Sequence, residues 1–238
     1  MCSLIFVRVD GALFVAANRD ERVDRASSPP EVWQGRWRRL LSPIDRVAGG
    51  TWLAVDGAGR VAGLTNIHGA PAVADAPSRG HLPHLALDHD DTRRGVDAVL
   101  RRVDEVEHAG FQLVVADKSQ TFVIRHVEGV VSCEEWRQPV LALTNQHAAG
   151  AWTPRGLSRA VRADLDVAQR LDALATCLRD RGGDGLHAVC KHGDAYRTVS
   201  SSLLVLPWDR AVAATWRYAE GPPDVTAFRD YGDLSAQL

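Results

Sequence analysis

The chain has 238 residues, of which 45% are hydrophobic, and a formal net charge of −2 at pH 7. These values are typical of one folded globular domain, so we expect a single domain over residues 1–238 with a peripheral tail after about residue 222. A nearly balanced charge excludes a strong electrostatic attraction to nucleic acid or to anionic membranes. Arg8 and Asp10 interrupt the first apolar run. We therefore expect no secretory signal, no membrane insertion and a cytoplasmic location.

Lysine and cysteine usage indicate the source and the compartment. Only two of the 28 basic residues are lysines, which is typical of a GC-rich coding genome and predicts a bacterial protein. The cysteines show no Cys-x-x-Cys spacing, which argues against disulfides and against a zinc site in a reducing compartment. Cys133, Cys177 and Cys190 are therefore assigned to packing.

Two hairpins are predicted in the first part of the chain. Residues 3–9 and 12–17 are rich in β-branched and aromatic residues and flank Asp10-Gly11, which is a strong hairpin signal. The same pattern recurs at residues 51–56 and 60–65. Each pair of segments is therefore expected to form antiparallel strands.

The middle of the chain combines a loop, a helix and further strands. Residues 68–90 contain three prolines and are predicted to form a loop, in which the histidines are solvated. Apolar residues then recur at helical spacing from Val96 to a helix end near Gly110. Strands are predicted at 111–117, 121–127 and 139–144, with a fourth candidate at 130–134.

A second helix and two strands are predicted in the last third of the chain. Thr153 and Pro154 suit the N-cap and the first position of a helix that extends to about Gly182, with a break near residues 164–166. Strands are predicted at 197–206 and 211–217. Strands in hairpin order with two amphipathic helices between them predict a layered α+β sandwich.

Cys2 is the strongest candidate nucleophile. Its small side chain permits removal of the initiator methionine, after which Cys2 would carry a thiol and a free α-amine, with ordinary pKa values of about 8.5 and about 7.7–8.0. An N-terminal amine can act as the general base for such a nucleophile without a histidine. The alternative is that Cys2 only begins a strand and is inert.

Six short motifs follow Met1-Cys2 in a fixed order. They are Asn-Arg-Asp-Glu at 18–21, Gly-Gly-Thr-Trp-Leu at 49–53, Gly-Leu-Thr-Asn at 63–66, Ser-Arg-Gly at 78–80, Leu-Thr-Asn at 143–145 and Tyr-Arg-Thr at 196–198. Together they resemble the NRDE, or transport and Golgi organisation, family. That family is similar to cysteine N-terminal nucleophile hydrolases such as bile-salt and penicillin V amidases. The resemblance implies a four-layer αββα sandwich.

The resemblance also implies roles for individual residues. Cys2 would attack a carbonyl, Asp20 would hold the α-amine, and Asn66 and Asn145 would donate hydrogen bonds to the oxyanion. Each asparagine has an alternative role in a turn. The implied activity is cleavage of a non-peptide amide, or acyl transfer, through a Cys2 acyl-enzyme. The expected partner is a small-molecule acyl substrate, and no cofactor or metal is expected.

The chain departs from the amidase pattern at two arginines. The amidases carry arginine where this chain has Ala17, whereas here Arg19 lies within the motif, and adjacent strand residues face opposite ways. Family members commonly carry arginine where this chain has Val199. Arg197 would share a face with Val199 at a displacement of about 6.6 Å along the strand. Arg197 is therefore either a shifted equivalent, or the group has been lost.

A binding or trafficking protein is the alternative interpretation of function. The family resemblance links the chain to intracellular haem movement and to acyl-CoA or lipid metabolism, and haem is expected only under this alternative. His81 and His84 could ligate a metal or haem iron, but solvated loop histidines are the favoured interpretation. The presence of Cys2, Asp20, Asn66 and Asn145 favours an enzyme, whereas Val199 in place of arginine favours lost or altered catalysis.

Overall fold

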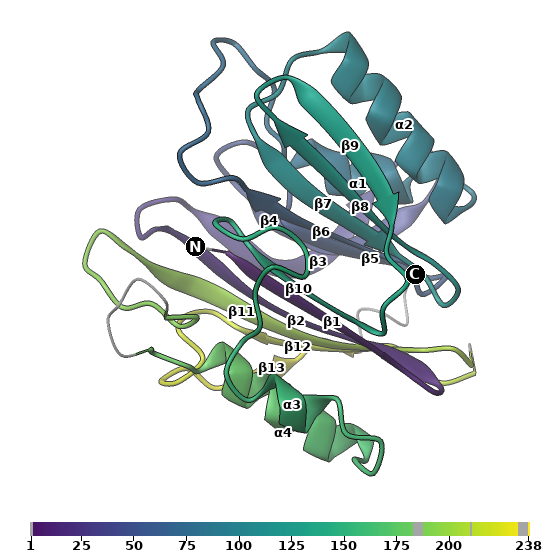
Figure 1. The fold of residues 1–238 in the computed structure, drawn as a ribbon, viewed down its shortest axis with the longest axis vertical. Coiled ribbons are helices and arrows are strands. Elements are labelled where there is room, and N and C mark those ends of the chain that lie inside the picture. Colours follow the sequence, from purple (N-terminus) through teal and green to yellow (C-terminus); the bar gives the residue numbers. More distant parts are fainter. Residues whose placement is uncertain (1, 183–187, 210, 233–237) are drawn as a thin grey trace. The chain divides into compact units, whose positions relative to one another are not determined.

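A computed structural model describes residues 2–182, 188–209, 211–232 and 238 (Figure 1). The chain divides into two compact units, a first unit of Met1–Arg25 with Gln138–Asp233 and a second unit of Ala26–Arg137 with Leu234–Leu238. Each unit has its own antiparallel sheet and its own hydrophobic core. Residues 26–137 of the second unit are inserted in the sequence of the first unit. The single domain expected over residues 1–238 stays a prediction.

The first unit contains a sheet whose described strands are ordered β10-β1-β2-β11-β12-β13. Helix α4 contacts β2 and β11. Apolar side chains of the sheet and of the two helices α3 and α4 form the core of this unit. In chain order the elements are β1 (Ser3–Val9), β2 (Ala12–Arg22), β10 (Val140–Thr144), α3 (Leu157–Ala160), α4 (Val167–Leu178), β11 (Tyr196–Pro207), β12 (Thr215–Ala219) and β13 (Arg229–Asp230).

The predicted hairpin at the start of the chain is confirmed. Val9 pairs with Ala12, and Gly11 between them has a φ of 90°, which glycine adopts without steric strain. Strand β2 continues well beyond its predicted end at residue 17, because β11 pairs with it as far as Arg22. The Asn-Arg-Asp-Glu motif therefore lies inside a strand and next to a strand from the other end of the sequence.

The helix predicted from Thr153 begins later than expected. After the short α3, helix α4 starts at Val167 and is capped by Asp166, whose carboxylate accepts a hydrogen bond from the Gln169 N–H at 2.8 Å. The Gln169 side chain accepts in return from the Asp166 N–H at 3.1 Å, which completes a capping box. The predicted break near residues 164–166 is confirmed.

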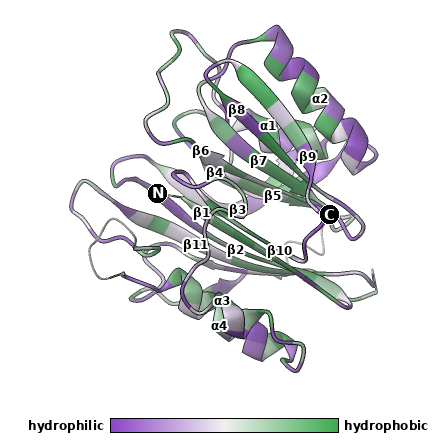
Figure 2. Ribbon diagram, in the orientation of Figure 1, coloured by the Kyte–Doolittle hydropathy of each residue, from purple (hydrophilic) through white to green (hydrophobic). Residues whose placement is uncertain are grey.

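The second unit contains a sheet whose described strands are ordered β3-β4-β5-β6-β7-β8-β9. Its core is formed by apolar side chains of the strands together with α1 and α2, and α2 carries both hydrophilic and hydrophobic residues (Figure 2). In chain order the elements are β3 (Ser27–Gln34), β4 (Arg39–Asp45), β5 (Leu53–Asp56), β6 (Val61–Asn66), α1 (His81–Leu87), α2 (Thr92–Glu105), β7 (Phe111–Ala116), β8 (Thr121–Val127) and β9 (Val130–Glu135).

Helix α1 corrects the prediction of a loop over residues 68–90. Pro83 is compatible with the helix because it lies in the first turn, where main-chain N–H groups have no partner within the helix. His84 is 3% exposed and its ring stacks on Trp33, with centroids 4.1 Å apart. The prediction of solvated histidines is therefore wrong for His84.

Two strands of this unit lie outside the predicted ones, and one prediction is wrong. Strands β3 and β4 were not predicted, because prolines interrupt both; β3 lies at the sheet edge, where a missing N–H donor is tolerated. Cys133 lies on the other edge strand, β9, and is exposed rather than packed. Among the described residues, no helix is both long and apolar enough to cross a membrane.

Candidate functional site

Cys2 directly precedes β1, the strand that pairs with β2 on one side and β10 on the other. Its main-chain carbonyl accepts a hydrogen bond from the Asn145 N–H at 3.1 Å. Its thiol donates to the main-chain carbonyl of Asp20, with Sγ 3.7 Å from the oxygen. Cys2 is half-buried, and burial together with the nearby Asp20 charge raises the pKa of its thiol. A thiol in this state needs a base before it can act as a nucleophile.

Asp20 is buried, and its carboxylate is held across the sheet. Oδ1 accepts a hydrogen bond from the Thr198 hydroxyl at 2.6 Å, and the main-chain carbonyl accepts one from the Tyr196 hydroxyl at 2.7 Å. Burial raises the pKa of Asp20, while the Thr198 hydrogen bond and the Lys191 charge act in the opposite direction. The contacts keep the carboxylate in one position close to Cys2.

A β-bulge in β11 sets the position of Thr198. Pairing between β11 and β2 shifts between Thr198 and Ser200, so that Val199 is an extra residue. The alternation of faces that the sequence analysis assumed for Arg197 and Val199 therefore does not hold across this point. Arg197 lies before the bulge and is exposed. Its role as a shifted arginine stays a prediction.

Arg19 lies in β2 beside Asp20 and is 4% exposed. Its guanidinium lies 3.9 Å from the carboxylate of Glu21. The charge of Arg19 lowers the pKa of Cys2, although burial has the larger effect and raises it. Arg19 therefore belongs to the electrostatic surroundings of Cys2, and a direct catalytic role stays a prediction.

Asn145 is the amide residue that the structure brings next to Cys2. Its Oδ1 is buried and accepts no hydrogen bond from the described residues. The turn after β10 is instead closed by the Thr144 hydroxyl, which accepts from the N–H groups of Gln146 and His147 at 3.1 Å each. The Asn145 side chain is therefore not engaged in turn formation. Asn66 lies exposed at the end of β6 in the second unit, and its role as an oxyanion donor stays a prediction.

Asn18 is a buried residue to which the sequence analysis assigned no role. Its Nδ2 donates to the carbonyls of Leu178 and Val189 at 2.9 Å each, and its Oδ1 accepts from the Ser201 hydroxyl at 2.6 Å. These bonds tie β2 to the end of α4 and to the segment before Cys190. The sequence signal for this role is a polar residue that directly continues an apolar strand.

Thr198 and Tyr196 belong to the Tyr-Arg-Thr motif of the sequence, but their contacts with Asp20 depend on strand register.

Two solved structures define the class of fold. The C2A mutant of conjugated bile acid hydrolase from Clostridium perfringens has a TM-score of 0.56 at 8% identity, over 97% of this chain and 96% of that chain. The Caenorhabditis elegans N-acylethanolamine-hydrolyzing acid amidase ortholog has a TM-score of 0.56 at 13% identity, over 88% and 95%. At such low identity the likeness shows the fold alone. The fold is α+β of the N-terminal nucleophile hydrolase type, as predicted.

Sequence relatives define the family. The family model described as Transport and Golgi organisation 2 matches residues 1–214. The human Transport and Golgi organization protein 2 homolog is 36% identical over 248 aligned positions, which cover 86% of each chain. The mouse homolog is 35% identical over 114 positions, which cover 45% of this chain and 39% of that relative, well under half its length. The chain belongs to the transport and Golgi organisation 2 family.

Proposed function

We propose that this chain is a cysteine N-terminal nucleophile hydrolase that cleaves a non-peptide amide, or transfers its acyl group, through a thioester on Cys2. The observation that supports the proposal most directly is the contact of the Cys2 thiol with Asp20, whose buried carboxylate is held by Thr198. The hydrolase-type fold favours the same chemistry, although a fold alone does not define a reaction.

Acylation begins with proton transfer within Cys2. Once Met1 has been removed, the α-amine accepts the thiol proton, which is required because burial disfavours the free thiolate. The thiolate attacks the substrate carbonyl carbon and forms a tetrahedral intermediate. The C–N bond then breaks, the leaving amine takes the proton from the α-ammonium, and the acyl group remains on Cys2 as a thioester.

Deacylation uses the same amine as a base. The α-amine accepts a proton from water as the water oxygen attacks the thioester carbonyl. The C–S bond breaks, the thiolate of Cys2 recovers the proton, and a carboxylic acid is released. An acceptor amine or alcohol in place of water gives acyl transfer. The Asp20 carboxylate balances the charge of the α-ammonium. The attraction between the two charges is stronger in a buried site than in water.

The oxyanion of each tetrahedral intermediate requires hydrogen-bond donors. We assign this role to the side-chain amide of Asn145, whose main-chain N–H donates to the Cys2 carbonyl; the role of Asn66 stays a prediction. One such donor contributes about 2.7–4 kcal/mol to transition-state stabilisation in a well-studied hydrolase. Arg19 and Arg197 supply positive charge around the substrate under this proposal.

Trapping of the acyl-enzyme tests the proposal. Intact-mass spectrometry would follow wild type and Cys2→Ala with a panel of acyl amides, esters and thioesters, with Cys133→Ala as a control at an exposed cysteine in the second unit. Wild type and the control should gain the acyl mass on a slowly hydrolysed substrate, whereas Cys2→Ala should bind substrate without an adduct or turnover.

The same experiment distinguishes the enzyme from a carrier. If no member of the panel forms an adduct or is turned over, and haem or an acyl-CoA binds wild type and Cys2→Ala equally, the chain functions in binding or trafficking. The hydrolase proposal would then be overturned.

A further inference from the structure

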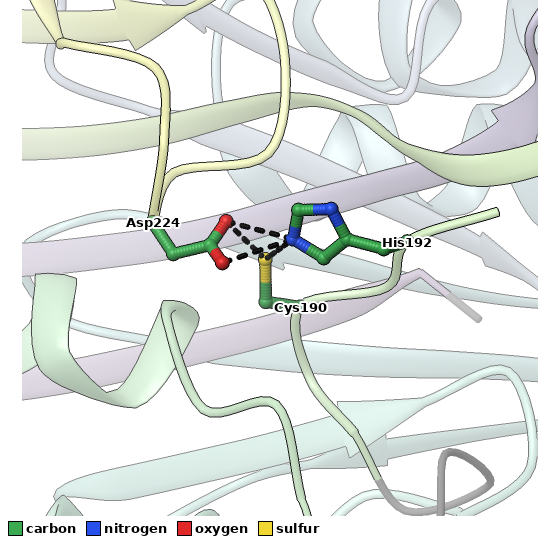
Figure 3. Close-up of side chains that lie close together, drawn as sticks. All are labelled: Cys190, His192 and Asp224. Atoms are coloured by element: carbon green, nitrogen blue, oxygen red, sulfur yellow. Dashed lines mark hydrogen bonds and ion pairs between the residues drawn. The ribbon is translucent and has the colours of Figure 1, made fainter.

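Cys190, His192 and Asp224 bring three potential metal ligands together in the first unit (Figure 3). His192 Nε2 lies 2.9 Å from Asp224 Oδ2 and 3.8 Å from Cys190 Sγ. Cys190 Sγ lies 3.1 Å from Asp224 Oδ1. The first two residues precede β11, and Asp224 follows β12. Chain segments on both sides of β11 and β12 therefore converge on one point.

The separations are close to those around a tetrahedral ion. Zn²⁺ bonds of about 2.3 Å to sulfur and about 2.0–2.2 Å to nitrogen and oxygen place neighbouring ligand atoms about 3.3–3.6 Å apart. The observed separations of 2.9, 3.1 and 3.8 Å differ from these values by a few tenths of an ångström. Small side-chain rotations would therefore admit the ion, and a thiolate, an imidazole and a carboxylate are established zinc ligands.

A Cys-His-Asp catalytic triad does not explain the cluster. In a triad the carboxylate holds one imidazole nitrogen while the other nitrogen faces the nucleophile. Here Nε2 of His192 alone faces both Cys190 and Asp224, and Nδ1 points away from them (Figure 3). One nitrogen of His192, the Cys190 sulfur and the Asp224 carboxylate therefore lie close together, as the ligand atoms of one metal ion do.

We propose that Cys190, His192 and Asp224 bind one Zn²⁺ ion, with a water molecule as the fourth ligand. Binding replaces the Cys190 thiol proton, which is released to solvent. Arg181 Nε lies 3.8 Å from Asp224 Oδ2 and acts as an outer partner of the carboxylate. No Cys-x-x-Cys pair is needed, because the ligands come from Cys-x-His and from a residue 34 positions after the cysteine.

The ion has a structural role in this arrangement. Lys191 lies between two of the ligands, and its main chain holds Thr198 twice: its N–H donates to the Thr198 hydroxyl at 2.9 Å, and its carbonyl accepts from the Thr198 N–H at 3.0 Å. Thr198 in turn holds the Asp20 carboxylate. Zinc would therefore rigidify the segment that positions Thr198, without contacting Cys2.

Metal titration tests the site independently of any enzymatic activity. The full-length protein would be stripped of metal with a chelator and titrated with Co²⁺, and zinc in untreated protein would be counted by elemental mass spectrometry. One equivalent of Co²⁺ should produce the visible bands of a tetrahedral site and a thiolate-to-cobalt absorption in the near ultraviolet. Untreated protein should contain about one Zn²⁺ per chain.

Matched variants identify the ligands. Cys190→Ser should abolish the thiolate-to-cobalt band, and His192→Gln should weaken Co²⁺ binding by at least about tenfold. The His192 side chain is 32% exposed, so this variant should fold even if the buried Cys190→Ser does not. Cys133→Ser should bind as wild type does. Substoichiometric zinc together with a missing thiolate-to-cobalt band in wild type, or unchanged Co²⁺ affinity in His192→Gln, would overturn the proposal.

Discussion

The Thr198 hydroxyl donates a 2.6 Å hydrogen bond to Oδ1 of Asp20, which lies directly opposite it in the ladder between β11 and β2. The same hydroxyl oxygen accepts from the Lys191 N–H, so its own hydrogen is directed to the carboxylate. Burial raises the pKa of Asp20, whereas this hydrogen bond stabilises the charged carboxylate and lowers the pKa. Thr198 is therefore a positioning residue for the candidate site.

Loss of the Thr198 hydroxyl should change the pH dependence of activity. In Thr198→Val the pKa of Asp20 should rise further, because the hydrogen bond that favours the carboxylate is gone. The acid limb of the kcat/KM profile should therefore move to higher pH, whereas Thr198→Ser should keep the wild-type limb. The measurement is substrate hydrolysis across pH 4–9. An unmoved limb in Thr198→Val would contradict the positioning role.

Asp20→Asn should separate activity from stability. Burial raises the pKa of Asp20, so the folded state binds more protons than the unfolded state. The stability that Asp20 contributes is therefore present at low pH and is lost as the pH rises through the pKa of the folded state. Asparagine keeps an oxygen for the Thr198 hydroxyl and cannot ionise. We expect an activity loss of at least about a hundredfold, with a free energy of unfolding at pH 7 no lower than that of wild type.

Denaturant unfolding at pH 4 and pH 7 measures this difference. The advantage of Asp20→Asn over wild type should grow between the two pH values. A loss of stability at pH 7 that is large enough to explain the loss of activity would remove Asp20 from the proposed mechanism.

Asn145→Ala should lower acylation with little effect on stability. Its Oδ1 forms no hydrogen bond with the described residues, and its main-chain bond to Cys2 survives the substitution. The expected fall in acylation rate is roughly a hundred- to a thousandfold, as for an oxyanion donor. Rapid-mixing measurement of adduct formation, paired with thermal unfolding, tests both parts. A rate within a few fold of wild type would exclude the donor role.

Asn18→Ala is the structural counterpart of that experiment. It leaves the carbonyls of Leu178 and Val189 and the Ser201 hydroxyl without their buried partner. Each unsatisfied group costs about 1–3 kcal/mol, so the three together should lower the free energy of unfolding by about 3 kcal/mol or more. Equilibrium denaturation measures it. An unchanged midpoint would show that these bonds contribute little.

The mature chain should begin at Cys2. Retention of Met1 would convert the required α-amine into an amide, which cannot accept the thiol proton. Intact mass of native material decides this, and a Cys2→Leu variant, whose larger second residue disfavours methionine removal, is the control. Full retention of Met1 in wild type would eliminate the proposed base.

Limited alkylation at neutral pH should label Cys2 before the other cysteines. Burial raises the pKa of Cys177 to about 11, and in the metal-free protein burial with the Asp224 contact raises that of Cys190 to about 12. Cys133 is an exposed residue with no neighbouring base in the proposal, and partial desolvation of its sulfur raises the pKa of its thiol as well. Peptide mapping gives the order. Faster labelling of Cys133 would indicate that the α-amine does not activate Cys2.

Sequence alone determined the features that local chemistry encodes. The turn at Gly11 followed from Asp10-Gly11, because glycine adopts a positive φ without strain. The order of six motifs after Cys2 identified the family and with it the fold class. Local signals also misled: prolines concealed β3, β4 and α1, and Thr153-Pro154 predicted the helix start that the capping box at Asp166 provides in the structure.

Tertiary structure alone decided which side chains meet. The bond between Thr198 and Asp20 joins residues 178 positions apart, and it depends on strand register and on the bulge at Val199. The cluster of Cys190, His192 and Asp224 likewise forms only when segments on both sides of two strands converge. Composition and spacing do not encode such contacts: a shift of one residue in the pairing of β11 with β2 would turn Thr198 away from Asp20, and the three-residue cluster depends on where loops meet rather than on any local pattern.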